Sequence, residues 1–226
     1  MLIYKIKKLY PLQGITVLYN NDTAYSLLLY RLYVFVLYKI QGGGGVKSVE
    51  PIKDKEVVND IIGYLKIKSD RDAMLFTFGI YSGLRISDII RLRVRDVRGR
   101  DRITVKETKT GKDKILRLNQ ELKKSIAAYV KDKKDYEFMF KSRNGINRHI
   151  SRQRAYSIIR DAGQSFGLEH IGTHTMRKTF GYHIYQETKD ITLVQKLLNH
   201  SSPEITLAYI GMTQKAMEDA VDRLRY

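Results

Sequence analysis

His174-Thr175-Met176-Arg177 is the stretch around which this chain of 226 residues is organised, and it has partners downstream at His200 and Tyr209. On a helix, His174 and Arg177 stand three positions apart and share one face. An arginine fork holds two oxygens of a phosphate, and the imidazole beside it can donate a hydrogen bond or move a proton. A tyrosine hydroxyl acts as a covalent nucleophile where neighbouring groups stabilise charge. The pattern therefore predicts phosphate chemistry, with the rest of the chain as its scaffold.

The composition is strongly basic, because 41 Lys and Arg residues stand against 24 Asp and Glu and give a formal net charge of +17. Such a surface favours a polyanion, and nucleic acid is the first candidate. A solvated basic surface and a membrane-facing patch are the other interpretations, but the phosphate-handling residues support neither. The chain has no cysteine, which excludes a disulfide framework and fits a reducing cytoplasm.

Residues 1–45 differ in composition from everything that follows. They hold seven of the sixteen tyrosines, five Lys or Arg, and a single acid, Asp22. The apolar run over residues 27–40, LLLYRLYVFVLYKI, falls short of the ~20 residues that a membrane-spanning helix needs. The glycines after it make a poor signal-peptide cleavage site. A membrane anchor, a helix docked on the core and a stretch outside the natural coding sequence all stay open.

The boundary at Val46 suggests a start of translation. Residues 42–45 are four consecutive glycines, whose codons all begin with GG and resemble a bacterial ribosome-binding site. One valine codon, GUG, serves as an alternative start. We therefore expect the natural protein to begin at or near Val46.

From Val46 onward the pattern is that of a mainly helical α+β domain with a sizeable core. Apolar residues at helical spacing predict a helix over residues 56–66. Ser69 is a plausible N-cap for a second helix, which ends at Ser82-Gly83 and is so apolar that we expect it at the centre of the domain. Residues 84–88 open the next helix. Further helical patterns lie at about 119–131, 150–166, 174–188, 190–199, 202–210 and 213–224.

Alternating residues predict a β-hairpin, with strands over 102–106 and 114–118 and a turn over 109–112 that carries Lys109. Residues 137–140 are expected to add a short third strand, and Asn144-Gly145 marks a turn. The predicted fold class is therefore mainly α with a small antiparallel β-sheet. The start of the helix after His200 has two candidate caps, Ser201 in a capping box and Ser202 followed by a proline.

Six residues stand out by their chemistry: Arg85, Lys109, His174, Arg177, His200 and Tyr209. The stretches that contain them resemble, in order and spacing, the catalytic domain of tyrosine recombinases, the phage integrase family. The matching stretches are Ser82-Gly83-Leu84-Arg85-Ile86-Ser87-Asp88, Thr108-Lys109-Thr110-Gly111-Lys112, His174-Thr175-Met176-Arg177-Lys178-Thr179-Phe180, Leu198-Asn199-His200-Ser201-Ser202 and Tyr209. The resemblance runs from about residue 46 to the end and implies the fold of that domain.

Each of the six residues also has a structural interpretation. Arg85 could pair with Asp88, Tyr209 could be a core tyrosine, and Lys109 is one of several lysines in the hairpin. The two histidines and Arg177 could be helix-end or surface residues. These interpretations leave the ordered coincidence of all six unexplained, so the set favours function.

The resemblance implies that Tyr209 attacks a scissile phosphate in duplex DNA. The 5′-oxygen leaves, a 3′-phosphotyrosine bond remains, and a 5′-hydroxyl from a second duplex reverses the step without ATP, metal or cofactor. Arg85 and Arg177 would clamp the non-bridging oxygens. His200 would donate a further hydrogen bond, and His174 would accept the tyrosine proton or orient the phosphate.

The hairpin and the segment before it are basic. The resemblance implies that Lys109, at the turn, protonates the leaving 5′-oxygen. The arginine run over residues 91–102 suggests contacts to the DNA backbone and, equally, a solvated loop moderated by Asp96 and Asp101. The residues assigned to the DNA backbone are Arg91, Arg93, Arg95 and Lys112.

Family members usually carry a helical core-binding domain ahead of the catalytic one, and residues 1–45 are too short for it. The chain thus resembles a minimal recombinase, bacterial or phage-encoded, cytoplasmic and nucleoid-associated. Its expected partners are double-stranded DNA and further copies of itself, as a dimer or tetramer on DNA, with no membrane. The helix over 213–224 would dock on a neighbouring protomer or on its own domain. Two alternatives remain: a DNA-binding accessory protein with a vestigial site, and a nicking-closing enzyme that relaxes a single duplex.

Overall fold

The structure is a computed structural model that describes residues 49–211 and Asp222. The segment over 1–45, the start expected at Val46 and, apart from Asp222, the helix expected over 213–224 lie outside the described residues. The predictions for those segments therefore stay predictions.

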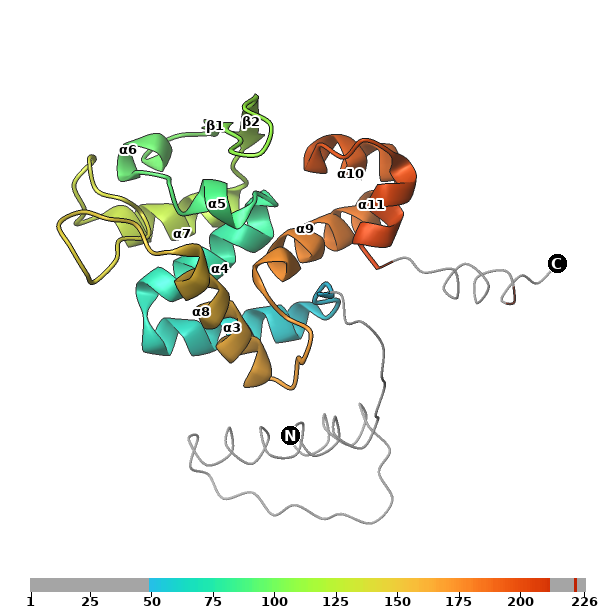
Figure 1. Cartoon of the computed structure of the whole chain (residues 1–226), viewed down its shortest axis with the longest axis horizontal. Helices are drawn as coiled ribbons and strands as arrows, with labels where there is room; N and C mark the ends of the chain where they lie inside the picture. The colour runs from blue at the N-terminus through green and yellow to red at the C-terminus, as the bar shows by residue number, and fades with distance from the viewer. Residues whose placement is uncertain (1–48, 212–221, 223–226) are drawn as a thin grey trace, which may run out of the picture. The chain divides into compact units, whose positions relative to one another are not determined.

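The described residues are mainly helical and contain one two-stranded antiparallel sheet, which confirms the predicted fold class (Figure 1). In chain order the elements are α3 (Lys55–Lys68), α4 (Asp70–Ser82), α5 (Ile86–Ile89), α6 (Val94–Val97), β1 (Arg102–Lys106), β2 (Asp113–Arg117), α7 (Gln120–Val130), α8 (Arg152–Gln164), α9 (Thr173–Thr188), α10 (Ile191–Leu198) and α11 (Pro203–Tyr209). The short α6 is the one element among these that the sequence pattern did not predict.

Helix α4 lies at the centre of the domain, as its composition predicts. The Ser69 hydroxyl oxygen accepts a hydrogen bond from the Asp72 N–H at 3.4 Å and caps its start. Gly83 ends the helix with a φ of 60°, a conformation that glycine adopts at little cost. All residues from Asp72 to Gly79 are buried, and α4 contacts α3, α5, α7, α8 and α9. A helix buried on all sides places its neighbours around itself.

The β-hairpin is the predicted one, with β1 and β2 paired so that Ile103 faces Leu116 and Val105 faces Lys114. Ile103, Val105 and Leu116 are buried, whereas the residues between them on β1 are exposed. The alternation lays one face of the hairpin on the core and leaves its turn, residues 107–112, beyond the strands.

The third strand predicted at residues 137–140 is wrong. Phe138 and Lys141 make only isolated bridges, with Arg93 and His149 respectively. Met139 and Phe140 are both fully buried, so two successive side chains enter the core. Successive side chains of a β-strand point to opposite faces of the sheet. Residues 137–140 are apolar like a strand, but they form no strand and bury Met139 and Phe140 one after the other.

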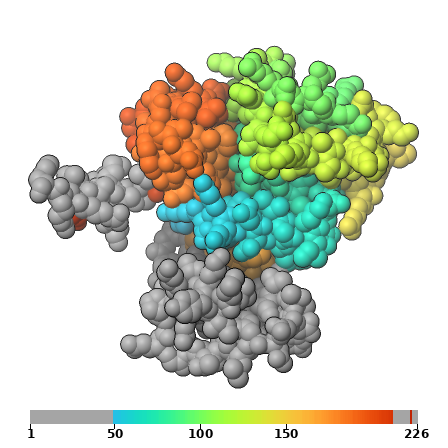
Figure 2. Space-filling view, turned by 180° about the vertical axis from the view of Figure 1, so that it is seen from behind, coloured from blue at the N-terminus to red at the C-terminus, as the bar shows by residue number. Residues whose placement is uncertain are grey.

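Helix α9 connects the main core to a smaller cluster formed by Val194, Leu198 and Ile210 of the last helices. Met176, on α9, is fully buried in the main core. In Figure 1 the helices α9 to α11 lie on one side of α4, and in Figure 2 the orange surface of α9 and α10 lies beside the green surface of the hairpin region. The candidate residues on α9, α10 and α11 are thereby brought towards the hairpin.

Close packing of α4 against α9 requires a glycine at position 79. A methyl group added to Gly79 would lie 2.4 Å from the Met176 sulfur and 3.0 Å from Met176 Cβ. The Cβ atom cannot move without moving α9 itself. Gly79→Ala is therefore expected to lower the free energy of unfolding by about 1–3 kcal/mol through overpacking.

Gly63→Ala on α3 is the matched control, because a methyl group there meets no atom within 4 Å. Alanine is the better helix former, so this variant is expected to gain about 0.5–1 kcal/mol. Urea unfolding of both variants measures the two values. A Gly79→Ala variant as stable as the Gly63→Ala variant would contradict the close approach of α4 and α9.

Candidate active site

Arg177 is buried in the middle of the domain, with 2% of its surface exposed. Its Nη1 donates to the Gly83 carbonyl at 2.6 Å, and its Nη2 donates to the Leu198 carbonyl. Burial lowers the pKa of Arg177, but a guanidinium stays charged in proteins. A permanent positive charge is thereby fixed between the end of α4 and the end of α10.

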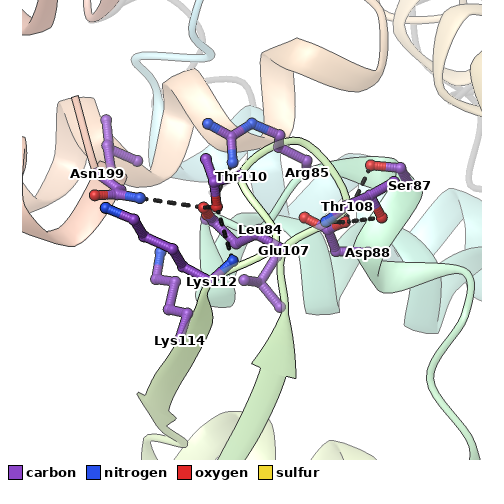
Figure 3. Close-up of polar contacts among 12 residues, drawn as sticks. Leu84, Arg85, Ser87, Asp88, Glu107, Thr108, Thr110, Lys112, Lys114 and Asn199 are labelled. Atoms are coloured by element: carbon purple, nitrogen blue, oxygen red, sulfur yellow. Dashed lines mark hydrogen bonds and ion pairs between the residues drawn. The ribbon is translucent and has the colours of Figure 1, made fainter. Parts of the chain in front are cut away.

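Arg85 lies directly before α5 and forms an ion pair with Glu107 of the hairpin turn. Its Nη1 is 2.8 Å from Glu107 Oε1, and 18% of the arginine side chain is exposed (Figure 3). The alternative partner, Asp88, is engaged elsewhere. Its Oδ1 accepts from the Thr108 N–H at 3.0 Å and from the Thr108 hydroxyl at 2.7 Å. Asp88 therefore binds Thr108 of the hairpin turn, and the carboxylate that pairs with Arg85 is that of Glu107.

His200 lies at the junction between α10 and α11. Ser202 is the N-cap of α11, and its hydroxyl oxygen accepts a hydrogen bond from the Ile205 N–H at 3.3 Å. Of the two predicted caps, Ser201 and Ser202, the structure therefore has Ser202, followed by proline at the first helical position. The Thr206 hydroxyl lies 3.2 Å from His200 Nδ1 and 3.1 Å from the Ser202 carbonyl oxygen. It has a single proton, so it donates either to His200 or to Ser202 at any moment. Burial, and then the charge of Arg177, lower the pKa of His200 to about 4. The imidazole is therefore neutral at pH 7.

Tyr209 ends α11 and turns its hydroxyl towards α9 of the same chain. Its Oη is 3.3 Å from His174 Nδ1, and its ring packs edge-on against the His200 ring at a centroid distance of 4.8 Å. Lys178 Nζ lies 5.1 Å from the centre of the tyrosine ring. Burial raises the pKa of Tyr209 above its ordinary value, although the charge of Arg177 acts in the opposite direction. The hydroxyl is therefore protonated at neutral pH.

Lys109 lies in the turn of the hairpin, where its side chain is exposed. Burial lowers the pKa of His174, and the positive charges near it act in the same direction. Those charges belong to Arg177, Lys178, Arg85 and Lys109. The structure thus brings together the arginine, histidine and tyrosine candidates, and it places Lys109 near enough for its charge to act on His174.

Three further residues belong to this site, and the sequence pattern did not single them out: Glu107, Lys114 and Asn199. Glu107 Oε2 accepts from Asn199 Nδ2 at 3.1 Å and from the Thr110 hydroxyl at 2.9 Å. Lys114 Nζ donates to the Leu197 carbonyl at 2.5 Å. Burial, and then the charge of Arg177, lower the pKa of Lys114 to about 8. The sequence signal was weak, since Glu107 and Asp113 are the two acids among the basic residues of the hairpin.

The residues assigned to the DNA backbone fall into two groups. Arg93 donates from Nη1 to the Tyr136 carbonyl at 2.6 Å and lies 4.4 Å from the centre of the Phe138 ring, so it holds the neighbouring loop. Arg91, Arg95 and Lys112 are exposed. Arg91 contacts the Thr108 hydroxyl at 3.5 Å and Arg95 lies 3.9 Å from Asp96 Oδ1, both at the long end of such contacts.

The described part of the chain has no group of three or more His, Asp or Glu side chains placed to hold a metal ion. Across residues 49–211, no helix is both long enough and apolar enough to cross a membrane.

Known proteins are similar to this chain in sequence and in fold. The profile of the phage integrase family matches residues 53–216. The "Probable integrase/recombinase YoeC" of Bacillus subtilis (strain 168) is 49% identical over 166 residues, which are 74% of this chain and 91% of that protein. The "Tyrosine recombinase XerA" of Pyrococcus horikoshii is 27% identical over 183 residues, which are 79% of this chain and 63% of that protein.

Two solved structures have the same fold. The crystal structure of XerA recombinase superposes with a TM-score of 0.64 at 21% identity, covering 91% of this chain and 78% of that one. XerH site-specific recombinase, bound to palindromic difH substrate, gives a TM-score of 0.62 at 20% identity and covers 80% of this chain and 54% of that one. The family profile spans most of the chain, and the relative from Bacillus subtilis is matched over nearly its whole length. The chain therefore belongs to the phage integrase family, together with its tyrosine recombinase relatives.

Proposed function

We propose that this chain is a site-specific DNA recombinase or integrase that cleaves and rejoins DNA strands through a 3′-phosphotyrosine intermediate. The observation that carries the proposal is the position of the Tyr209 hydroxyl, 3.3 Å from His174 Nδ1 and beside the buried Arg177. A nucleophile next to a base and a fixed positive charge is the arrangement that covalent catalysis needs. Relatives in this family are named integrases and recombinases, and the solved structure of XerH is a complex with its DNA substrate.

In this proposal the scissile phosphate binds between Arg85 and Arg177. Their guanidinium groups come from the start of α5 and from α9, and both are held in place before the substrate arrives. Charge that develops on the non-bridging oxygens of the transition state then meets donors that need no rearrangement. A single preorganised donor of this kind contributes on the order of 10²–10³ in rate.

The two histidines take different roles. His174 accepts the proton of Tyr209 through Nδ1 as the tyrosine oxygen attacks phosphorus, and its lowered pKa keeps it unprotonated and ready to accept. The neutral His200 donates from Nε2 to the phosphate, which requires Nδ1 to accept from the Thr206 hydroxyl. Thr206 would then release the Ser202 carbonyl.

Lys109 protonates the leaving 5′-oxygen. Its exposed position in the turn lets it approach a strand that lies across the site. The exposed Arg91, Arg95 and Lys112 contact the DNA backbone and fix the register of the protein on the duplex. Religation runs through the same groups in reverse, with the energy of the phosphodiester kept in the phosphotyrosine bond.

Double-stranded DNA is the proposed substrate, and the strand exchange requires at least two copies of the chain on DNA. The complete set of phosphate-binding and proton-moving residues argues against an accessory protein with a vestigial site. A nicking-closing enzyme would use the same cleavage step. A joining assay with two separate labelled duplexes decides between them, because only a recombinase transfers strands from one duplex to the other.

Tyr209→Phe is expected to abolish covalent attachment to DNA and to leave DNA affinity unchanged, since only the nucleophilic oxygen is lost. The measurement is the yield of protein–DNA adduct on a nicked duplex that traps the intermediate. Tyr182→Phe is the matched control and should form adduct at the wild-type rate. An adduct that persists in Tyr209→Phe would assign the nucleophile to another tyrosine.

Lys109→Ala is expected to cripple cleavage of an ordinary phosphodiester. It should do far less harm when the bridging 5′-oxygen is replaced by sulfur, because a thiolate leaves without a proton. The ratio of the two single-turnover rates measures the effect. Equal losses on both substrates would remove the general-acid role from Lys109.

His200 makes the stability of the domain depend on pH. Its pKa in the folded protein is lowered to about 4, against an ordinary value of 6.5, so the unfolded chain takes up the proton first as the pH falls. Stability present above pH 6.5 is therefore lost progressively down to about pH 4. His200→Asn should flatten this part of the pH profile in urea unfolding, with the wild-type protein as the reference. A profile identical to that of the wild type would contradict the burial of a neutral His200.

A further inference from the structure

Glu107 is an acid buried inside a basic site. Only 1% of its surface is exposed, although a carboxylate is almost never fully buried without partners. Burial acts to raise its pKa, but the hydrogen bonds and positive charges around it lower the pKa below its ordinary value. These neighbours are Thr110, Asn199, Arg85 and Lys114. Glu107 therefore stays ionised at neutral pH.

The partners of this carboxylate come from three separate parts of the chain (Figure 3). Arg85 Nη1 donates to Oε1 at 2.8 Å from the start of α5. The Thr110 hydroxyl donates to Oε2 at 2.9 Å from the turn that contains Lys109. Asn199 Nδ2 donates to Oε2 at 3.1 Å from the residue before His200. The Glu107 side chain thus binds Arg85 itself, the residue after Lys109 and the residue before His200.

The hairpin and the end of α10 are joined by two bonds, and Glu107 makes one of them. The other runs from Lys114 on β2 to the Leu197 carbonyl. Asn199 is the C-cap of α10, with a left-handed φ of 53°, and its side-chain amide donates to Glu107 at 3.1 Å. The bond between Glu107 and Asn199 therefore ties the hairpin turn to the residue next to His200.

We propose that Glu107 is a positioning residue for strand cleavage, whose buried carboxylate holds Arg85, the Lys109 turn and the His200 junction in one arrangement. The inference rests on the proposed function, since these three are the phosphate clamp, the proton donor and the neutral hydrogen-bond donor. Glu107 does not itself touch the phosphate, because its negative charge would repel it. It acts through the three groups that it binds.

The first test is Glu107→Gln, which keeps the shape of the side chain and removes its charge. A glutamine has one acceptor oxygen and an amide donor, so it cannot accept from Arg85, Thr110 and Asn199 together. A displacement of about 1 Å in a reacting group costs on the order of 10²-fold in rate, and a loss of this size is expected for adduct formation on the nicked duplex. Glu121→Gln is the matched control, an exposed glutamate on α7 that pairs with Lys124.

The second test separates positioning from folding. Glu107→Gln should lose less rate on the sulfur-bridged substrate than on the ordinary one, because the thiolate no longer needs the Lys109 turn in place. Thr110→Val removes the bond from the turn to Glu107, together with the 3.3 Å bond that the same hydroxyl accepts from the Lys112 N–H. It should show the same preference for sulfur with an unchanged melting temperature. A variant that is merely less stable would lose the same factor on both substrates, and that result in both variants would overturn the proposal.

The third test is a rescue. Asn199→Asp alone sets a second carboxylate against Glu107 and should slow adduct formation. Combined with Glu107→Gln, it returns an acceptor opposite the new amide and restores the bond between the hairpin and the α10 end. The double variant should react faster than either single variant. A double variant no faster than Glu107→Gln would overturn the link to the His200 junction.

The wild-type protein distinguishes this inference from the function on which it rests. A wild type that forms no adduct overturns the proposed function. A wild type that forms adduct while Glu107→Gln does so at the same rate, and with the same preference between the two substrates, overturns only the role of Glu107.

Discussion

A buried guanidinium that satisfies the ends of two helices is the interaction on which this structure depends. Arg177 donates to the last carbonyls of α4, at Gly83, and of α10, at Leu198. Helix carboxyl ends carry partial negative charge and unsatisfied carbonyls, so they compensate part of the cost of burying a cation. The same contacts join the main core to the small cluster of α10 and α11. Removing the charge would therefore disturb the architecture as well as any chemistry at the site.

The site gathers more positive than negative charge. Arg85, Arg177 and Lys114 lie close enough for each to influence the ionisation of groups around them, and Glu107 compensates only in part. Like charges held together weaken the folded state in the absence of an anion, and a bound phosphate relieves the repulsion. An arrangement that favours a polyanion is therefore expected to cost local stability, as is common where function opposes stability.

Features that depend on near neighbours in the chain were predictable from the sequence. Ser69 and Asn119 cap their helices because a short polar side chain beside a helical pattern finds the free N–H groups of the first turn. The hairpin followed from its alternation and its turn. The third strand failed because the apolar run at residues 137–140 buries two successive side chains, a result of packing that no local pattern records.

The candidate site likewise has features that the sequence predicts and features that only the packing reveals. Its arginines, histidines and tyrosine could be chosen by chemistry and order, but their geometry could not. Glu107 binds residues 22 positions before and 92 positions after it, and such long-range partners leave no period or motif in the sequence. Lys114 looked like one hairpin lysine among several, and only its burial against the end of α10 sets it apart.

Gly79 also determines how α9 is oriented about its own axis. With Met176 in contact with its backbone, α9 lies so close to α4 that it cannot rotate about its own axis without driving a side chain into the neighbouring main chain. A rotation by one residue would move His174 and Arg177 through about 100°, since a helix has 3.6 residues per turn. The angular setting of these two candidate side chains is thus fixed by a residue on another helix that has no side chain at all.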